Sequence, residues 1–419
     1  MFAVRAILCI LSALSTCTAV PLASIQHEHN HHGIQHPRKS ISSPVKVTQE
    51  HAFVPPAPGQ QRGPCPALNA LANHAYISRD GIVSLLEAVN GVTTVFDMGI
   101  DLATLLAVMA VVWAGDALSP NPSFSIGGID VRVTDAVGGL IGTTGPAQGL
   151  AKAHDILEAD ASPTRNDLYL TGDAATMNLT RFEKLYSLVP TDRAFTMDDM
   201  ADFAVIRFRE SIEENKYFYY GPFTGLVARS ASFCFVGRLL ANHSDGHAGG
   251  TLTHGILKSF YAVTGDDPSN FTYKRGWERI PENWYGGSGG YGVAEINLDI
   301  ISMAVRHPVL ASIGGNTGTV NSFTGVDLSN PATGLANIPS LLKSNNLMCF
   351  ALELVKGAIP STANSLFATL AGPLTKLFDA VDAPLLSLAC PAWRSVTEGG
   401  QSFLKRLQAT YPGAKGSAL

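Results

Sequence analysis

The stretch RGPCPALNALANHAYISRDG, residues 62–81, decides how the fold of this chain begins. Apolar side chains at positions 68, 71, 72 and 75 follow the i, i+3, i+4, i+7 spacing of one helix face. Pro66 suits the first helical position, because the N–H that it lacks would have no partner there. The spacing therefore predicts a helix that begins immediately after Cys65.

Cys65 stands at the predicted N-terminus of this helix, between two prolines that stiffen the loop. The positive end of the helix dipole and the unpaired N–H groups stabilise a thiolate at such a position. A thiolate there can bind a metal ion or attack as a nucleophile, and a thiol can also be half of a disulfide. The residues alone leave these three roles open.

The composition of the whole chain excludes two classes of protein. The 419 residues contain 29 Lys and Arg against 34 Asp and Glu, a net charge of -5, which excludes a basic nucleic-acid binder. Charged residues make up only 15% and hydrophobic residues 46%, so disorder over the whole length is excluded too.

Helical spacing runs through most of the chain after residue 64, and the alternation typical of strands is scarce. The clearest helical segments are Leu102–Trp113, Met197–Glu214, Leu226–Leu240 and Ile296–Val305. The first is apolar nearly all round and too short for a bilayer, so we expect a helix buried in the core. We predict an all-α fold, a single multi-helix domain with long loops over residues 56–395.

The two ends of the chain differ from this domain in their residue pattern. Arg5, the apolar run at residues 6–14 and the small residues after it predict a signal peptide over residues 1–19, and therefore secretion. Residues 20–55 are rich in histidine and predict a prosegment or disordered arm. Residues 396–419 predict a mobile C-terminal tail. Acceptor sequons at Asn178, Asn242 and Asn270 fit a glycosylated extracellular protein.

The Pro-Cys-Pro sequence at residues 64–66, with ALNALANH and then RDG behind it, resembles a known motif. It is similar to the proximal motif of the fungal heme-thiolate peroxidases, the chloroperoxidase and unspecific peroxygenase family. The resemblance covers approximately residues 60–392 and implies that Cys65 is the axial ligand of heme b. A thiolate ligand pushes electron density to iron and favours O–O cleavage, which is why such a site uses cysteine.

The stretch HDILEADASPTRND, residues 154–167, gathers oxygen donors of the kind that a hard divalent cation prefers. A capped helix start explains the same residues equally well. The stretch resembles the family's second motif, which implies a magnesium ion bound by Glu158, the Ala159 carbonyl and Ser162, with Asp160 supporting the loop. Family members carry Gly or His where this chain has Ala159, a change to which a backbone carbonyl is indifferent.

The family also uses a distal glutamate that takes a proton from the bound peroxide and returns it to the leaving oxygen. The best matching region, YFYYGPFTGLVAR at residues 217–229, offers Ala228 or Arg229 at that place. An isolated cation in an apolar run needs a partner, and we predict Arg229 as a distal catalytic residue, with a buried salt bridge as the alternative. His154 or His243 can supply the proton transfer, and nothing in the sequence selects one.

Six cysteines reduce to four once Cys9 and Cys17 leave with the signal peptide. The resemblance implies a disulfide between Cys349 and Cys390. Cys234 lies in an apolar setting and is predicted to be a buried free thiol. This leaves Cys65 unpaired, as ligation requires.

The resemblance therefore implies a secreted oxidoreductase with heme b and Mg²⁺ as cofactors. Its partners would be hydrogen peroxide and an organic, aromatic small molecule, as in members that serve aromatic polyketide biosynthesis, with no nucleic acid and no membrane. One alternative is a heme-thiolate protein without peroxide turnover, with a binding or isomerising role. Another is a heme-free secreted interaction protein in which Cys65 pairs with Cys234.

Overall fold

The computed structural model describes residues 43–116, 119, 121–133, 147–244, 249–287, 289–325, 346, 349 and 405–416. Contacts divide the chain into two units, Met1–Pro37 and Arg38–Leu419, and all described residues belong to the second. The predicted signal peptide lies outside the described residues. Within them, every helix is too short or too polar to cross a bilayer.

Helix α1 (Pro66–Asn73) begins where the sequence predicts. Cys65 is its N-cap, with extended backbone angles, and Pro66 occupies the first helical position. Of the predicted apolar face, Leu71 and Ala72 are fully enclosed and Leu68 is partly buried, whereas Ala75 lies beyond the end of the helix. This helix fixes the place of Cys65 in the molecule.

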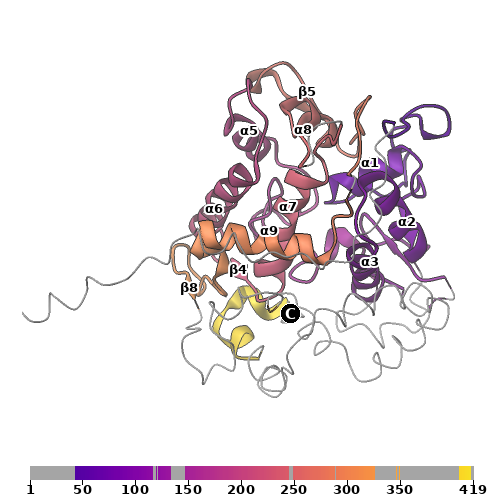
Figure 1. Ribbon diagram of the computed structural model, residues 1–419. Coiled ribbons are helices and arrows are strands. Elements are labelled where there is room, and N and C mark those ends of the chain that lie inside the picture. Colours follow the sequence, from indigo (N-terminus) through magenta and orange to yellow (C-terminus); the bar gives the residue numbers. More distant parts are fainter. Residues whose placement is uncertain are drawn as a thin grey trace, which may run out of the picture. The chain divides into compact units, whose positions relative to one another are not determined.

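Helices α2 (Leu85–Phe96) and α3 (Ile100–Ala114) pack against each other beside α1 (Figure 1). The start of α2 is a capping box, in which Ser84 accepts from the N–H of Glu87 while the Glu87 side chain accepts from the Ser84 N–H. The apolar segment predicted as a buried core helix is α3, and residues on both its faces are enclosed. That prediction is confirmed.

Three further helices pack against one another on the other side of the domain (Figure 1): α6 (Met197–Glu214), α7 (Ser230–Arg238) and α9 (Val293–Arg306). The bounds of α6 agree with the prediction at both ends. A Thr196–Asp199 capping box marks its start. The segment predicted as one helix over 226–240 instead begins as a π-helix, η4 (Thr224–Arg229), before it becomes α7. Such π-helical turns occur frequently at functional sites. The shorter helices are α4 (Leu168–Thr171), α5 (Leu179–Ser187) and α8 (His254–Phe260).

Short antiparallel strands modify the all-α prediction, so the fold is mainly helical rather than purely so. Each strand is two or three residues long and pairs loop segments at the rim of the helical core. Three strands form the sheet β1-β3-β2, three form β4-β7-β8, and β5 pairs with β6. Their bounds are β1 (Ile82–Ser84), β2 (Gly115–Asp116), β3 (Ser123–Ser125), β4 (Tyr219–Tyr220), β5 (Val263–Thr264), β6 (Thr272–Tyr273), β7 (Gly314–Gly315) and β8 (Thr324–Gly325).

The packed domain extends upstream of the predicted boundary at residue 56. The Val54 N–H donates to the Asn73 carbonyl and the Val45 N–H donates to the Trp284 carbonyl. The His51 ring stacks on Tyr76 with 3.9 Å between ring centroids. The prediction of a disordered arm is therefore wrong for residues 43–55.

The predicted mobile tail is wrong for residues 405–416. Leu407, Tyr411 and Ala414 are buried in the core, and the Tyr411 hydroxyl donates to the Thr324 carbonyl. These three residues lie at i, i+4 and i+7, so a helical face was present in the sequence. The face is short, and the Pro412-Gly413 pair interrupts it between Tyr411 and Ala414, which concealed the signal.

Candidate active site

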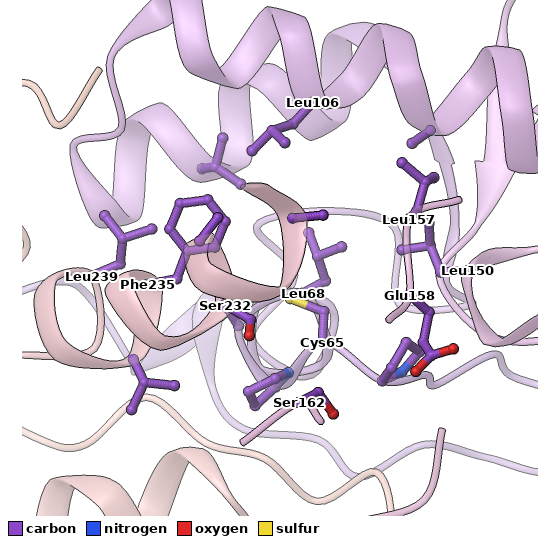
Figure 2. Close-up of a pocket in the computed structure, with 18 of the residues that line it drawn as sticks. Cys65, Leu68, Leu106, Leu150, Leu157, Glu158, Ser162, Ser232, Phe235 and Leu239 are labelled. Atoms are coloured by element: carbon purple, nitrogen blue, oxygen red, sulfur yellow. The ribbon is translucent and has the colours of Figure 1, made fainter. Parts of the chain in front are cut away.

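A cavity of about 340 Å³ lies in the described part of the chain, between α1, α3, η4, α7 and the loop at residues 157–165. Cys65 is part of its wall and lies in the middle of the view in Figure 2, with Phe235 and Leu239 on one side and Leu157 and Glu158 on the other. Most of the lining is apolar and comes from Leu68, Leu106, Leu150, Leu157, Phe235 and Leu239, among others. The cavity brings the two sequence motifs together around one apolar space.

Cys65 contributes a free thiol to this cavity. Burial raises the pKa of the thiol, although the backbone N–H groups of Leu68 and Ala67 and the Arg165 cation act in the opposite direction. The predicted stabilisation by the helix N-terminus is therefore present but smaller than the cost of desolvation. A nucleophilic cysteine needs a lowered pKa, whereas a bound metal cation displaces the proton of a buried thiol directly. Burial therefore does not activate Cys65 as a nucleophile, and its role as a metal ligand stays a prediction.

The loop that carries Cys65 is held by side chains from two directions. Arg165 donates from Nε and Nη2 to the Pro64 carbonyl, at 3.2 and 2.9 Å. The Asn69 side chain pairs with both the N–H and the carbonyl of Gly63, each at 3.0 Å. Neither residue was predicted to have a role in the site. Because these bonds fix the backbone on both sides of the sulfur, Cys65 is preorganised.

The second motif brings Glu158, Ala159 and Ser162 to the cavity wall. Glu158 Oε1 and Ser162 Oγ are buried, and neither has a hydrogen-bond partner among the residues that the structure describes. Buried acceptors without partners are costly unless something outside the chain satisfies them. Groups of three or more His, Cys, Asp or Glu able to hold a metal do not occur among the described residues. The predicted magnesium ligands contain only one residue of these types, Glu158, beside a backbone carbonyl and a hydroxyl. The absence of such a group therefore does not test them.

Behind Glu158 lies a buried group of charges. His154 Nδ1 is 2.6 Å from Glu158 Oε2, and His154 Nε2 is 3.4 Å from Asp155 Oδ2 and 3.9 Å from Asp160 Oδ1. Burial lowers the pKa of His154, but the Asp155 and Glu158 carboxylates outweigh it and the pKa lies well above its ordinary value. The same burial raises the pKa of the Glu158, Asp155 and Asp160 carboxyls, so the four groups share their protons. His154 holds one oxygen of Glu158, and the other oxygen has no partner among the described residues.

Two buried arginines brace the same loop from behind. Arg229 Nε donates to the Ala161 carbonyl at 3.0 Å, and Arg207 Nε donates to the Ser162 carbonyl at 3.0 Å. Arg229 Nη2 also donates to the Ala204 carbonyl of α6, and its guanidinium lies 4.5 Å from the centroid of the Phe233 ring. Burial lowers the pKa of Arg229 to about 10, so it remains a cation at neutral pH.

These bonds change the interpretation of Arg229. It lines the cavity as predicted, but two of its donors point to backbone carbonyls, and only Nη1 has no partner within the described structure. Arg229 forms no salt bridge with any described residue, so its alternative role, a buried salt bridge, is not observed either. The geometry is that of a residue that positions the loop from Glu158 to Ser162, and its catalytic role stays a prediction.

The wall formed by η4 offers no acid. Ala228 lines the cavity and is the one residue of η4 that is not buried. His154 and His243, the predicted substitutes for the distal glutamate, do not line the cavity, and His243 Nε2 bonds to the Arg238 carbonyl instead.

Of the aromatic residues near η4, Phe223 lines the cavity, whereas Phe218, Tyr219 and Phe233 pack in the core.

The cysteine assignments have mixed outcomes. Cys234 is a fully buried free thiol, as predicted, and Cys65 is free as well, so the alternative pairing between them is wrong. Cys349 is buried and disulfide-bonded. Its predicted partner Cys390 lies outside the described residues, so that pairing stays a prediction.

Known proteins resemble the chain over most of its length. The family model described as "Peroxidase, family 2" matches residues 51–288. An aromatic peroxidase from Fusarium equiseti is 46% identical over 376 residues, which is 89% of this chain and 86% of that protein. A dothistromin biosynthesis peroxidase from Dothistroma septosporum is 34% identical over 400 residues, 92% and 94% of the two chains. An aromatic peroxygenase from Cyclocybe aegerita is 25% identical over 297 residues, 69% and 70% of the two chains.

Proposed function

The chain belongs to peroxidase family 2, the fungal heme-thiolate peroxidases, and is a peroxide-using oxidoreductase; from this premise we propose that it oxidises or oxygenates an apolar aromatic substrate with hydrogen peroxide. One observation carries the proposal. The free thiol of Cys65 opens from the N-terminus of α1 onto an apolar cavity that Glu158 and Ser162 also line. The names of the relatives support the aromatic substrate class.

The residues of the cavity fit a heme bound through Cys65. When bound, heme supplies the peroxide-activating iron, and a thiolate ligand makes O–O cleavage favourable. Cys65 would bind it, and Arg165 and Asn69 hold the cysteine loop in place. The apolar side chains of α3 and α7 exclude water and accept a flat hydrocarbon surface, while offering few polar groups to orient it.

We include a magnesium ion in the proposal. Glu158 Oε1, the Ala159 carbonyl and Ser162 Oγ would hold it, and the two side-chain oxygens among them are buried without a partner. All three are hard oxygen donors, which suit Mg²⁺. The ion would add a positive charge beside the cavity. His154, which takes the second oxygen of Glu158, orients the carboxylate from behind.

Removing the carboxylate at residue 158 tests this ion. Glu158→Gln keeps the size of the side chain but loses the charge, and we expect magnesium affinity to fall by at least about tenfold, since even the loss of an outer-shell partner costs that much. The measurement is metal content per chain after dialysis at a series of Mg²⁺ concentrations, with thermal unfolding alongside. The control is Glu213→Gln on the exposed face of α6. Equal metal content in both variants would remove the ion from the proposal.

Secretion and glycosylation also belong to the proposal. The signal peptide and the sequons support them. The three acceptor asparagines differ in access, because Asn270 is exposed, whereas the Asn178 side chain caps α5 and donates to Asn166. Asn270 is the acceptor that we propose first.

The function is tested by a peroxide assay on the purified, heme-loaded protein. We expect peroxide-dependent oxidation of a phenolic dye, and no oxidation without peroxide. Heme bound at one per chain without any turnover would contradict the proposal. That result would instead favour a heme-thiolate protein with a binding or isomerising role, which the missing acid at Ala228 supports.

A further inference from the structure

A chain of aromatic rings leads from the surface of the protein to the charged group behind Glu158. Tyr169, in the short helix α4, is 46% exposed, and Tyr217, between α6 and β4, is partly exposed. The centroid of the Tyr169 ring lies 5.3 Å from that of Tyr217 and 5.2 Å from that of His154, and both pairs are edge-to-face. Rings at these distances are in contact. The Tyr169 ring therefore joins solvent to His154.

The contacts continue from His154 to the cavity. His154 Nδ1 lies 2.6 Å from Glu158 Oε2, and Glu158 is part of the cavity wall. The side chains of His154 and Glu158 are 9% and 6% exposed, so protein rather than water fills this path. An exposed aromatic ring is ordinary by itself. Tyr169 differs because an unbroken series of contacts connects it with the site.

The size of the cavity limits which molecules can reach the site directly. Its volume of about 340 Å³ lies near the small end of ligand pockets, which hold roughly 300–1,000 Å³. The heme of the proposed function would occupy part of this volume. A phenolic group carried on a large molecule therefore needs a point of oxidation outside the cavity.

We propose that Tyr169 is such a point, a surface site at which phenolic groups too large for the cavity lose one electron. This inference rests on the proposed function, in which hydrogen peroxide is the oxidant and heme performs the one-electron chemistry. Tyr169 is a catalytic residue of this second reaction, because it touches the large substrate.

The electrons and protons of the reaction balance. Tyr169 gives an electron through His154 and Glu158 to the heme site and its hydroxyl proton to water, and becomes a neutral phenoxyl radical. A phenol in solution then returns a hydrogen atom to Tyr169 and leaves as a radical. One hydrogen peroxide takes up two electrons and two protons and gives two waters, so each peroxide oxidises two phenols.

Radical trapping on the heme-loaded protein tests the site without measuring turnover. After one equivalent of peroxide in the presence of a nitroso spin trap, peptide mass mapping should find the trap attached to Tyr169. Tyr169→Phe keeps the ring that contacts His154 and Tyr217 but cannot form the phenoxyl radical, so the adduct at this residue should be lost. The matched control is Tyr285→Phe, at a partly exposed tyrosine between β6 and α9, which should keep the Tyr169 adduct.

A matched pair of substrates gives the second readout. Phenol groups attached to dextran cannot enter the cavity, whereas the same phenol free in solution can. In Tyr169→Phe we expect peroxide-dependent oxidation of the dextran-bound phenol to be lost and that of the free phenol to continue at the rate of the parent. Tyr285→Phe should oxidise both as the parent does.

Each outcome decides the inference. A parent protein without the adduct at Tyr169, or one that oxidises only the free phenol, would overturn it and leave the proposed function standing. Equal oxidation of the dextran-bound phenol by the parent and Tyr169→Phe would do the same. Loss of both substrates in Tyr169→Phe at unchanged heme content would also overturn it, because the residue would then serve the cavity itself. A parent that oxidises neither substrate would overturn both the inference and the proposed function.

Discussion

Replacing Cys65 with alanine is expected to remove the thiolate spectrum and to lower heme content by about tenfold or more at equal heme concentration. The estimate is a lower bound, because losing an outer-shell partner of a metal ligand already costs about 10–100-fold in affinity. The sulfur-bearing residues that remain in the described cavity wall, Met98 and Met109, carry neutral thioethers, which do not supply the charge of a thiolate. Peroxide-dependent oxidation should be lost with the spectrum.

The chain provides a matched control for this variant. Cys234 is the other free thiol of the described residues and is fully buried in the core, where its Sγ lies 3.6 Å from Met303 Sδ. Cys234→Ala should keep both the spectrum and the heme content, at some cost in stability for the small void. If Cys65→Ala retained the spectrum of the parent, another residue would be the ligand.

Placing a glutamate at Ala228 is expected to raise the rate of peroxide consumption by about 10²–10⁴-fold, the usual contribution of general acid–base catalysis. Ala228 lines the cavity together with Val227 and Arg229, and it is the one residue of η4 that is not buried. A carboxylate there would supply a general acid–base group on the cavity wall for a peroxide bound in the cavity. The other described residues of this wall offer no acid for that step.

The control for this variant is Ala228→Gln, which has the size of glutamate but cannot transfer the proton. Initial rates of peroxide loss at saturating substrate compare the two variants with the parent. Equal rates in all three would mean that proton transfer at this position does not limit turnover. A gain in both variants would trace the effect to packing rather than to acid–base chemistry.

The parts of the fold that could be predicted have local signals. The helix after Cys65 follows from a proline at its first position and a regular apolar face. The bounds of α6 follow from the capping box at Thr196, and the burial of α3 follows from its apolar residues on every side. Each signal lies within one or two turns of the residues that it describes.

The contacts of the site could not be predicted, because they join residues far apart in sequence. Arg229 bonds to carbonyls 68 and 25 positions away, and Arg165 bonds to a carbonyl 101 positions away. No residue pattern marks such partners, so the sequence did not show that Arg229 positions the loop from Glu158 to Ser162; its catalytic role stays a prediction. Phe235 and Leu239 line the cavity, but in the sequence they look like ordinary core residues. The absent acid at Ala228 was visible only through the family resemblance.

The proposed function depends on one bond, between the Cys65 sulfur and heme iron. The most direct measurement is the absorption spectrum of the heme-loaded, reduced protein under carbon monoxide. A Soret band at the long-wavelength position that marks a thiolate-bound heme is the predicted result, and it should be absent from Cys65→Ala. A band at the position of a histidine-bound or unligated heme in the parent protein would contradict the account.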